Sequence, residues 1–390
     1  MDSSPVLALV YLTGKTGDMA TQRLMKEGLN TQAIARIAAA LARSTDRFPA
    51  KDFRREAQRG LDDLELKQRV RHIIAALRQC LPADFPQAAE ILARLKPHWD
   101  RGNGQDALWS FAAWPLIDYV AVHGLAHPQI ALQTLRQLTP LFSAEFALRP
   151  FIVQHPGVTL RELQRWCRDP DEHVRRLVSE GTRPRLPWGQ RLPQFMIDPA
   201  PVLGLLERLK DDASEYVRRS VANNLNDISK DHPDVVLRTC RHWLVGRDPQ
   251  RLRLVRHATR SLVKAGHPAV FRLLGYSESP KVKVHTWSVN KTRVRVGETV
   301  SMHISLKSQA KAEQRLVLDY AVYFVKANGR RAPKVFKLKT LTLGPAAVLN
   351  IDKRHSFKEI TTRRYYAGEH KIELIINGVA CAEVKFHLTV

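Results

Sequence analysis

The stretch "YVRRSVANNLNDISKDHPD" (residues 216–234) opens with almost the same residues as "HVRRLVSEGTRPRLPW" (residues 173–188). Val217 follows Val174 by 43 residues, and a looser copy at Val255 follows after a further 38 residues. This period is typical of helix pairs that stack as HEAT-type repeats. A single Val-Arg-Arg is an ordinary solvated helix edge, but its recurrence predicts a helical solenoid with a shared basic stripe.

The pattern of apolar residues changes once along the chain. Up to about residue 275, apolar residues recur at three- and four-residue spacing, which indicates helices. From about residue 280, apolar and polar residues alternate, and the Asn-Gly pairs in "ANGR" (327–330) and "INGV" (376–379) are typical of hairpin turns. We therefore predict two domains, an all-α HEAT-like helical solenoid over residues 1–275 and an all-β immunoglobulin-like sandwich over residues 280–390.

The composition is strongly basic. The 62 Lys and Arg outnumber the 38 Asp and Glu, and the formal net charge of +24 indicates a polyanionic partner, nucleic acid before membrane. The apolar run "PVLALVYL" (residues 5–12) is too short to span a membrane and is expected to be a buried helix turn. The four cysteines lie far apart and the 15 histidines show no ligand spacing, so no metal site or disulfide framework is predicted. A reducing, cytoplasmic setting fits.

The predicted sandwich is more basic than the predicted solenoid. Residues 279–390 contain 21 Lys and Arg against 8 Asp and Glu, a net charge of +13, which leaves +11 for the rest of the chain. Runs such as "KVFKLKT" (334–340) and "TTRRYY" (361–366) place cations on strand positions where they could follow phosphates. We expect this domain to grip DNA. The alternatives are a solubilising surface or a dimer contact.

Acidic residues share helix faces with the basic stripe. At about 100° per residue, Asp227 falls beside Arg219, and Glu180 falls beside Arg176, one helical turn earlier on the same face. A carboxylate about 4 Å from a phosphate would cost roughly 1 kcal/mol in water and roughly 4 at an effective dielectric of 20. A surface that only holds DNA should avoid this, unless the acids are internal ion-pair partners of these two arginines. Asn224 falls on the apolar face, where we expect it to bond turn carbonyls of the adjacent repeat.

Three stretches of the helical part resemble the HEAT-like repeat DNA glycosylases, specifically the alkylpurine DNA glycosylase C (AlkC) branch. They are "SAEFALRPF" (143–151), "VSEGTRPRLPWGQRL" (178–192) and "EYVRRSVANNLNDISKDHPD" (215–234). The resemblance extends over the helical domain, including "FRREAQRGLDDLELKQRVRHIIAAL" (53–77), whereas that of the C-terminal domain is architectural.

The resemblance implies a function in base excision repair. A member of this family is expected to remove cationic N-alkylated bases, such as 3-methyladenine and 3-methylcytosine, by hydrolysing the N-glycosidic bond. It needs no metal or organic cofactor and leaves the DNA strand intact. The expected partner is double-stranded DNA with alkylated bases and not a membrane. We expect a monomer in the cytoplasm, associated with the nucleoid when it is on DNA.

The same resemblance implies the site residues. Carried over from the matching motifs, Glu145, Glu180 and Asp227 are expected to be catalytic, and Trp188 is expected to contact the substrate from a stiff loop. A carboxylate can stabilise the oxocarbenium-like sugar and orient a water at the anomeric carbon, while the cationic base already leaves readily. The alternative for the tryptophan is a plug between repeats.

The basic residues of these motifs are interpreted as phosphate clamps that hold the DNA backbone. They are Arg149, Arg176, Arg183 and Arg219. Two rival interpretations remain. A non-catalytic DNA-binding HEAT module or scaffold would explain the basic stripe, but not the acids within it. A nuclease that uses the three acids as metal ligands would be inhibited by chelators and would cleave the strand.

Overall fold

The computed structural model describes residues 24–246, 248–360 and 363–390. The apolar run at 5–12 and the first two residues of "TTRRYY" therefore lie outside the described residues. The chain divides into two compact units, unit 1 (Met1–Asp231) and unit 2 (His232–Val390). In the described ranges, no helix combines the length and the apolar character that crossing a membrane requires.

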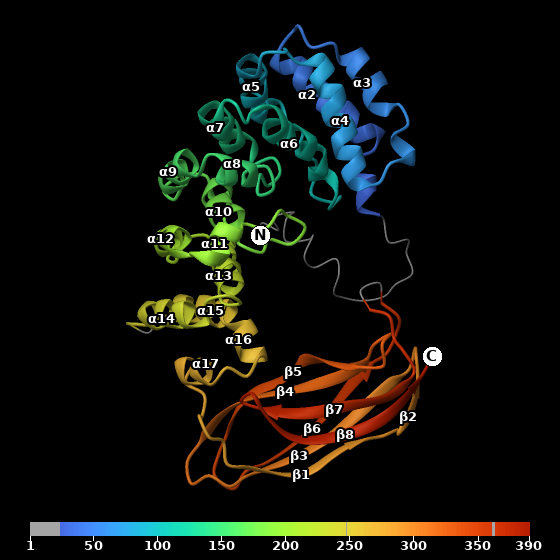
Figure 1. Cartoon of the computed structure of the whole chain (residues 1–390), viewed down its shortest axis with the longest axis vertical. Coiled ribbons are helices and arrows are strands. Elements are labelled where there is room, and N and C mark those ends of the chain that lie inside the picture. Colours follow the sequence, from blue (N-terminus) through green and yellow to red (C-terminus); the bar gives the residue numbers. More distant parts are fainter. Residues whose placement is uncertain (1–23, 247, 361–362) are drawn as a thin grey trace. The chain divides into compact units, whose positions relative to one another are not determined.

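Helices build the described part of unit 1 and follow one another along the chain (Figure 1). Asparagine and aspartate side chains cap several of them, as at Asn30 and Asp171, and prolines occupy many first turns. The α-helices are α2 (Thr31–Ser44), α3 (Ala50–Gln58), α4 (Leu66–Cys80), α5 (Phe85–Ala93), α6 (Trp114–His123), α7 (Pro128–Leu138), α8 (Arg149–Gln154), α9 (Pro156–Trp166), α10 (Glu172–Gly181), α11 (Pro193–Ile197), α12 (Ala200–Leu209) and α13 (Glu215–Ile228). The 3-10 helices are η1 (Met25–Gly28), η2 (Leu61–Asp63), η3 (Lys96–His98) and η4 (Trp109–Ala113).

The two repeated stretches form α10 and α13, which pack directly against each other. The apolar face of α13 is buried, as its helical spacing predicts, with Val217 and Leu225 both inaccessible to solvent. The prediction for Asn224 is confirmed, because its Nδ2 donates to the carbonyl oxygen of Ser179 at 2.7 Å and to Oγ1 of Thr182 at 3.0 Å. The amide group thus ties α13 to the end of α10.

Unit 2 begins with helices and continues with two β-sheets (Figure 1). The helices are α14 (Pro233–Trp243), α15 (Pro249–Ala258), α16 (Arg260–Lys264) and α17 (Pro268–Leu273). The strands are β1 (Val282–Val289), β2 (Arg293–Arg295), β3 (Thr299–Ser308), β4 (Gln314–Val325), β5 (Arg331–Leu343), β6 (Val348–Ser356), β7 (Gly368–Ile376) and β8 (Val379–Thr389).

The strands form a three-stranded sheet in the order β1-β3-β6 and a five-stranded sheet in the order β2-β8-β7-β4-β5. The β2–β8 pair is parallel and the other pairs are antiparallel. Buried side chains from both sheets pack together, including Met302 of β3 and Tyr320 of β4. The change from helix to strand lies between Leu273 and Val282, where the sequence pattern places it.

Both predicted Asn-Gly hairpins are confirmed. Gly329 lies in the turn between β4 and β5 with φ 73°, and Asn377 and Gly378 join β7 to β8 with φ 45° and 82°. At the second turn both central residues have positive φ, which is the geometry that favours Asn-Gly in two-residue hairpins. The amide of Asn377 also donates to the carbonyl oxygen of Ser277, so this second turn is anchored to the segment before β1.

The second turn is packed far more tightly than the first. A Cβ atom at Gly378 would lie 2.5 Å from Cα of Gly266, at the end of α16, whereas a Cβ at Gly329 would meet no atom within 4 Å. Close backbone contact therefore joins the helical start of unit 2 to the β7–β8 turn. Since the helices and the sheets make this contact within one unit, a cut near residue 275 would remove a packing partner of α17.

The two glycines allow a matched test of this contact. Gly329→Ala should lower the free energy of unfolding by about 1–2 kcal/mol, which is the cost of a left-handed conformation for alanine. Gly378→Ala should lower it by about 3 kcal/mol or more, because overpacking adds to the same backbone cost. Urea unfolding of the full chain measures both values. Equal losses would show that Gly266 does not hold the turn closely.

Candidate active site

Arg176 and Arg183 join the three predicted acids into one line of ion pairs. Nη1 of Arg176 donates to Oε2 of Glu145 at 2.6 Å, and its Nη2 lies 3.4 Å from Oε1 of Glu180. Nη1 of Arg183 donates to that same Oε1 at 2.7 Å, and its Nε donates to Oδ2 of Asp227 at 2.8 Å. Negative and positive groups thus alternate along what we call the acid–arginine chain.

Separate segments of unit 1 supply the members of this chain. Glu145 lies in the turns before α8, Glu180 near the end of α10, and Asp227 near the end of α13. Arg176 and Glu180 are four residues apart on α10, so they are neighbours on one helix face. Arg183 follows α10 and reaches across to α13, and the acid–arginine chain therefore fixes the packing of these segments by charge as well as by apolar contact.

Glu180 is at the centre of the acid–arginine chain and is buried, with 5% of its surface exposed. Burial alone would raise the pKa of Glu180, but the positive charges of Arg176 and Arg183 lower it to about 2. The hydroxyl of Ser220 adds to this effect by donating to Oε2 at 2.6 Å. Burial likewise disfavours the charged form of Arg176, but the carboxylate of Glu180 keeps its pKa raised. Each group therefore remains charged because of the others.

The three acids differ in how open they are. The exposed fraction of the side chain is 13% for Glu145, 6% for Glu180 and 2% for Asp227. Both carboxylate oxygens of Asp227 are bonded, since Nζ of Lys230 donates to Oδ1 at 2.9 Å, and both oxygens of Glu180 are bonded as well. Oε2 of Glu145 accepts from Arg176 and from Ser143, but no described residue donates to its Oε1. Among the three acids, Glu145 is thus the one with a carboxylate oxygen that accepts no hydrogen bond from a described residue.

Arg149 lies beside the acid–arginine chain and is fully buried. Its Nε donates to the carbonyl oxygen of Gln190, and its Nη1 donates to that of Gly181 at 2.9 Å. Its Nη2 is buried with no hydrogen-bond partner in the part of the chain that the structure describes. Burial, followed by repulsion from Arg183, lowers the pKa of Arg149 to about 10. The side chain joins the end of α10 to the loop that follows it.

The four arginines interpreted as phosphate clamps have different surroundings. Arg149, Arg176 and Arg183 are buried, and protein carbonyls and carboxylates take up their donors, so in this structure they present no open surface to a phosphate. Arg219 is 38% exposed and pairs with Glu215 at 2.7 Å. Of the two alternative ion pairs, that of Arg219 with Asp227 is therefore wrong, whereas that of Arg176 with Glu180 is present. Arg219 lies one helical turn from the residue that it binds, on the exposed side of α13.

Trp188 lies in the loop between α10 and α11, as predicted, and is 54% exposed. This exposure does not fit a plug between repeats. The backbone amide of Leu192 donates to the carbonyl oxygen of Pro184 at 3.1 Å, which closes residues 184–192 into a compact loop that we call the Trp188 loop. Trp188 has φ 63°, a left-handed conformation that costs a non-glycine residue of order 1–3 kcal/mol and that clusters at functional sites.

Sequence reasoning missed several partners of the acids. Lys230 could have been found, because it follows Asp227 by three residues, just past the end of α13. Ser143 stands two residues before Glu145 in the same motif, but nothing in the sequence indicates that its hydroxyl bonds that carboxylate. Ser220 pairs with an acid 40 residues away, so only the packing of α10 on α13 reveals it.

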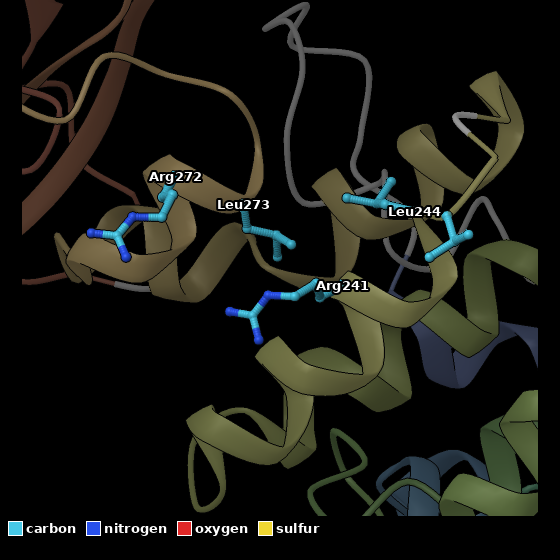
Figure 2. A pocket seen from close by; sticks show the side chains of 5 residues that line it. Arg241, Leu244, Arg272 and Leu273 are labelled. Carbon is cyan, nitrogen blue, oxygen red and sulfur yellow. The ribbon is translucent and has the colours of Figure 1, made fainter.

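Two further features of the molecule bear on where the site lies. Over the described ranges, no three His, Cys, Asp or Glu side chains are grouped so that they could hold a metal ion. A pocket in unit 2 lies between α14 and α17 and contains none of the predicted site residues (Figure 2). It is lined by Arg241, Leu244, Val245, Arg272 and Leu273. The acid–arginine chain and the Trp188 loop therefore remain the candidate site.

Comparisons with known proteins agree with this fold. Residues 283–390 match the family described as "Uncharacterised protein YhaZ, C-terminal Ig-like domain". "Uncharacterized protein YhaZ" of Bacillus subtilis (strain 168) is 38% identical over 316 residues, which are 81% of this chain and 85% of that protein. The structure of Pseudomonas fluorescens alkylpurine DNA glycosylase AlkC, bound to DNA containing an abasic site analog, matches with a TM-score of 0.88 and 38% identity. This match covers 94% of the present chain and 100% of the other, and the predicted fold class is confirmed.

The burial of Glu180 predicts a large and pH-dependent effect of its substitution. Glu180→Gln leaves Arg176 and Arg183 buried with one counter-charge fewer, which should lower the free energy of unfolding by about 3–5 kcal/mol near neutral pH. Because the pKa is lowered from 4.5 to about 2, the ionised carboxylate stabilises the fold fully above pH 4.5, and this contribution is lost as the pH falls towards 2.

Urea unfolding of both proteins across this pH range measures the difference. Glu207→Gln is the control, because Glu207 is 45% exposed in a surface pair with Lys210 and should contribute less than about 1 kcal/mol. A loss for Glu180→Gln as small as that of the control, or one independent of pH down to 2, would contradict the assignment.

Proposed function

The chain belongs to the alkylpurine DNA glycosylase C (AlkC) family, as the sequence predicted, and on this premise we propose that it is a DNA glycosylase for alkylated bases. The proposed reaction is hydrolysis of the N-glycosidic bond of cationic bases, with 3-methyladenine and 3-methylcytosine as substrates in duplex DNA. The observation that carries the proposal is the carboxylate oxygen of Glu145 to which no described residue donates. Phe146, the residue after Glu145, packs 3.3 Å from the Cβ position of Gly189, the residue after Trp188.

The proposed reaction needs an ionised carboxylate and does not need a proton donor. Methylation makes the base a cation, so the base takes the electron pair of the glycosidic bond and leaves as a neutral molecule without being protonated. A water molecule adds to the anomeric carbon, and a proton of this water passes to a proton acceptor of the protein. Oε1 of Glu145 can orient this water and accept the proton, and its charge stabilises the oxocarbenium-like sugar as it forms.

Glu180 and Asp227 are proposed to act indirectly, by holding in place the arginines that bind and orient Glu145. Arg176, Arg183 and Lys230 balance the charges of the three acids, so the acid–arginine chain as a whole is not an anion that attracts cations from a distance. Attraction for a cationic base therefore depends on the nearest carboxylate with an unbonded oxygen. A neutral base gains nothing from this contact and also leaves poorly, which explains selectivity for cationic bases.

Trp188 and the arginines take the remaining roles in this proposal. The exposed indole of Trp188 can contact the deoxyribose or the face of the cationic base. Arg149, Arg176 and Arg183 orient the acids and the Trp188 loop from inside the protein. Arg219, the exposed member of the four, is left as a phosphate contact, because its surface pair with Glu215 costs little to exchange for a phosphate.

Substitution of the open acid tests its role. Glu145→Gln should lower the single-turnover rate of base excision by about 10²-fold or more, because the amide does not accept the proton of the water. DNA affinity should stay the same or increase, because repulsion between the carboxylate and phosphate is removed. Glu90→Gln, an exposed acid of α5, is the control that should change neither quantity. Equal losses of affinity and rate in Glu145→Gln would favour a structural role.

The activity itself is tested with methylated duplex DNA in the presence of a chelator. The proposal expects release of free methylated base and an intact strand that carries an abasic site. Release of no base by micromolar enzyme would favour a non-catalytic DNA-binding module. Strand cleavage that the chelator abolishes would favour a nuclease.

Unit 2 is proposed to hold the DNA with its basic sandwich. Residues 279–390 carry a net charge of +13, and their positive side chains are not all neutralised locally. On β7, Lys371 lies 2.5 Å from Glu373 and 3.0 Å from Glu383, so its charge is engaged. On the edge strand β5, Lys337 and Lys339 are exposed. We therefore propose that Lys337 and Lys339 meet phosphates.

This proposal predicts a difference between two sets of lysines. Lys337→Gln with Lys339→Gln should flatten the slope of log affinity against log salt concentration by about 0.9 for each phosphate that the variant no longer neutralises. Lys371→Gln removes a charge of the same sign from a paired position and should leave the slope unchanged. DNA binding across a salt series measures both variants. Equal slopes in all proteins would mean that β5 does not contact DNA.

A further inference from the structure

The Trp188 loop is held by the ion pair of its own Arg185 with Asp231 and by contacts on two further sides. Inside, Arg149 binds the carbonyl oxygen of Gln190. Outside, Nζ of Lys67 in α4 lies 3.5 Å from the carbonyl oxygen of Trp188 itself, across 121 positions of sequence. This second contact reaches the one residue of the loop whose backbone is left-handed.

Asp118 in α6 lies within the range at which its charge and that of Lys67 attract each other. Its carboxylate is fixed by Nε1 of Trp114, which donates to Oδ2 at 2.8 Å. Burial raises the pKa of Asp118 to about 6, although the Trp114 hydrogen bond and then the Lys67 charge act in the opposite direction. Lys67 is thus an exposed cation that is attracted towards a fixed and partly buried acid.

Trp114 also connects to the Trp188 loop through aromatic packing. The ring of Trp114 lies 5.7 Å from that of Phe146, centroid to centroid. Phe146 in turn packs below Gly189, where a Cβ atom would come within 3.3 Å of its ring. Lys67 of α4 and Phe146, which packs on Trp114 of α6, therefore meet the Trp188 loop at two adjacent backbone positions, one polar and one apolar.

We propose that Lys67 is a positioning residue that fixes the backbone of Trp188 in its left-handed conformation through its contact with the carbonyl oxygen of that residue. The inference rests on the proposed function, in which Trp188 contacts the sugar or base. A strained backbone reverts unless its surroundings hold it, and the carbonyl of Trp188 is the group whose direction the left-handed conformation sets. Lys67 acts through that carbonyl and takes no part in the bond cleavage.

Hydrogen exchange tests the contact without reference to activity. The amides of Gly189 and Leu192 are bonded within the loop, to the carbonyl oxygens of Leu186 and Pro184. In Lys67→Met, peptides that contain these amides should take up deuterium at least about threefold faster. Lys67→Arg, which keeps a donor and a positive charge, should restore most of the protection. Lys51→Met, at an exposed lysine of α3, is the control and should match the wild type.

A double-mutant cycle tests the consequence for catalysis. Lys67→Met should lower the single-turnover excision rate by about tenfold with unchanged DNA affinity, because small misplacement of a substrate-contacting group is costly. In the Trp188→Ala background, Lys67→Met should have no further effect, because the side chain that it positions is missing.

Other results would overturn the inference. Rate losses that multiply in the double variant, or a loss of DNA affinity with a flatter salt slope, would identify Lys67 as a phosphate contact. Unchanged hydrogen exchange in Lys67→Met would show that Lys67 does not hold the loop. If the wild-type protein released no base, the proposed function would fail, and the exchange experiment would still decide whether Lys67 holds the loop.

Discussion

The ion pairs of Glu180 with Arg176 and Arg183 are the interaction on which the rest of the site depends. A buried carboxylate is tolerated only when its charge is matched and its oxygens are bonded, and both conditions hold here. The two arginines then have donors left over, which they direct to Glu145 and Asp227. The central acid thus serves the fold, and Glu145 keeps the oxygen that we propose for the reaction.

The site combines several features that are locally unfavourable. Charged side chains are buried, Nη2 of Arg149 has no hydrogen-bond partner among the described residues, and Trp188 has a left-handed backbone. Each feature weakens the fold, but together they hold the acid and the indole in place before a substrate arrives. Such preorganisation is what a reaction needs when the leaving group is already activated and only orientation and charge remain to be supplied.

The sequence predicted the parts of this arrangement that depend on local patterns. Helical spacing placed Leu225 in the core, Asn-Gly pairs located two hairpins, and the prolines near Trp188 indicated a loop. The burial of charged side chains and their ion-pair partners were harder to predict. The angular position of a residue around a helix does not show which other segment packs against that residue. The sequence therefore assigned Arg219 to Asp227, whereas Arg183 reaches that acid from a different segment. The contact of Lys67 with Trp188 spans 121 positions and follows no local pattern.

The central claim is that an unbonded carboxylate oxygen selects a cationic base in DNA. The most direct test compares the single-turnover release of 3-methyladenine with that of hypoxanthine, a neutral purine, from otherwise identical duplexes. We expect release of the cationic base and no measurable release of the neutral one. We also expect Glu145→Gln to reduce this discrimination. Comparable release of both bases by the wild-type protein would show that the selectivity does not depend on charge.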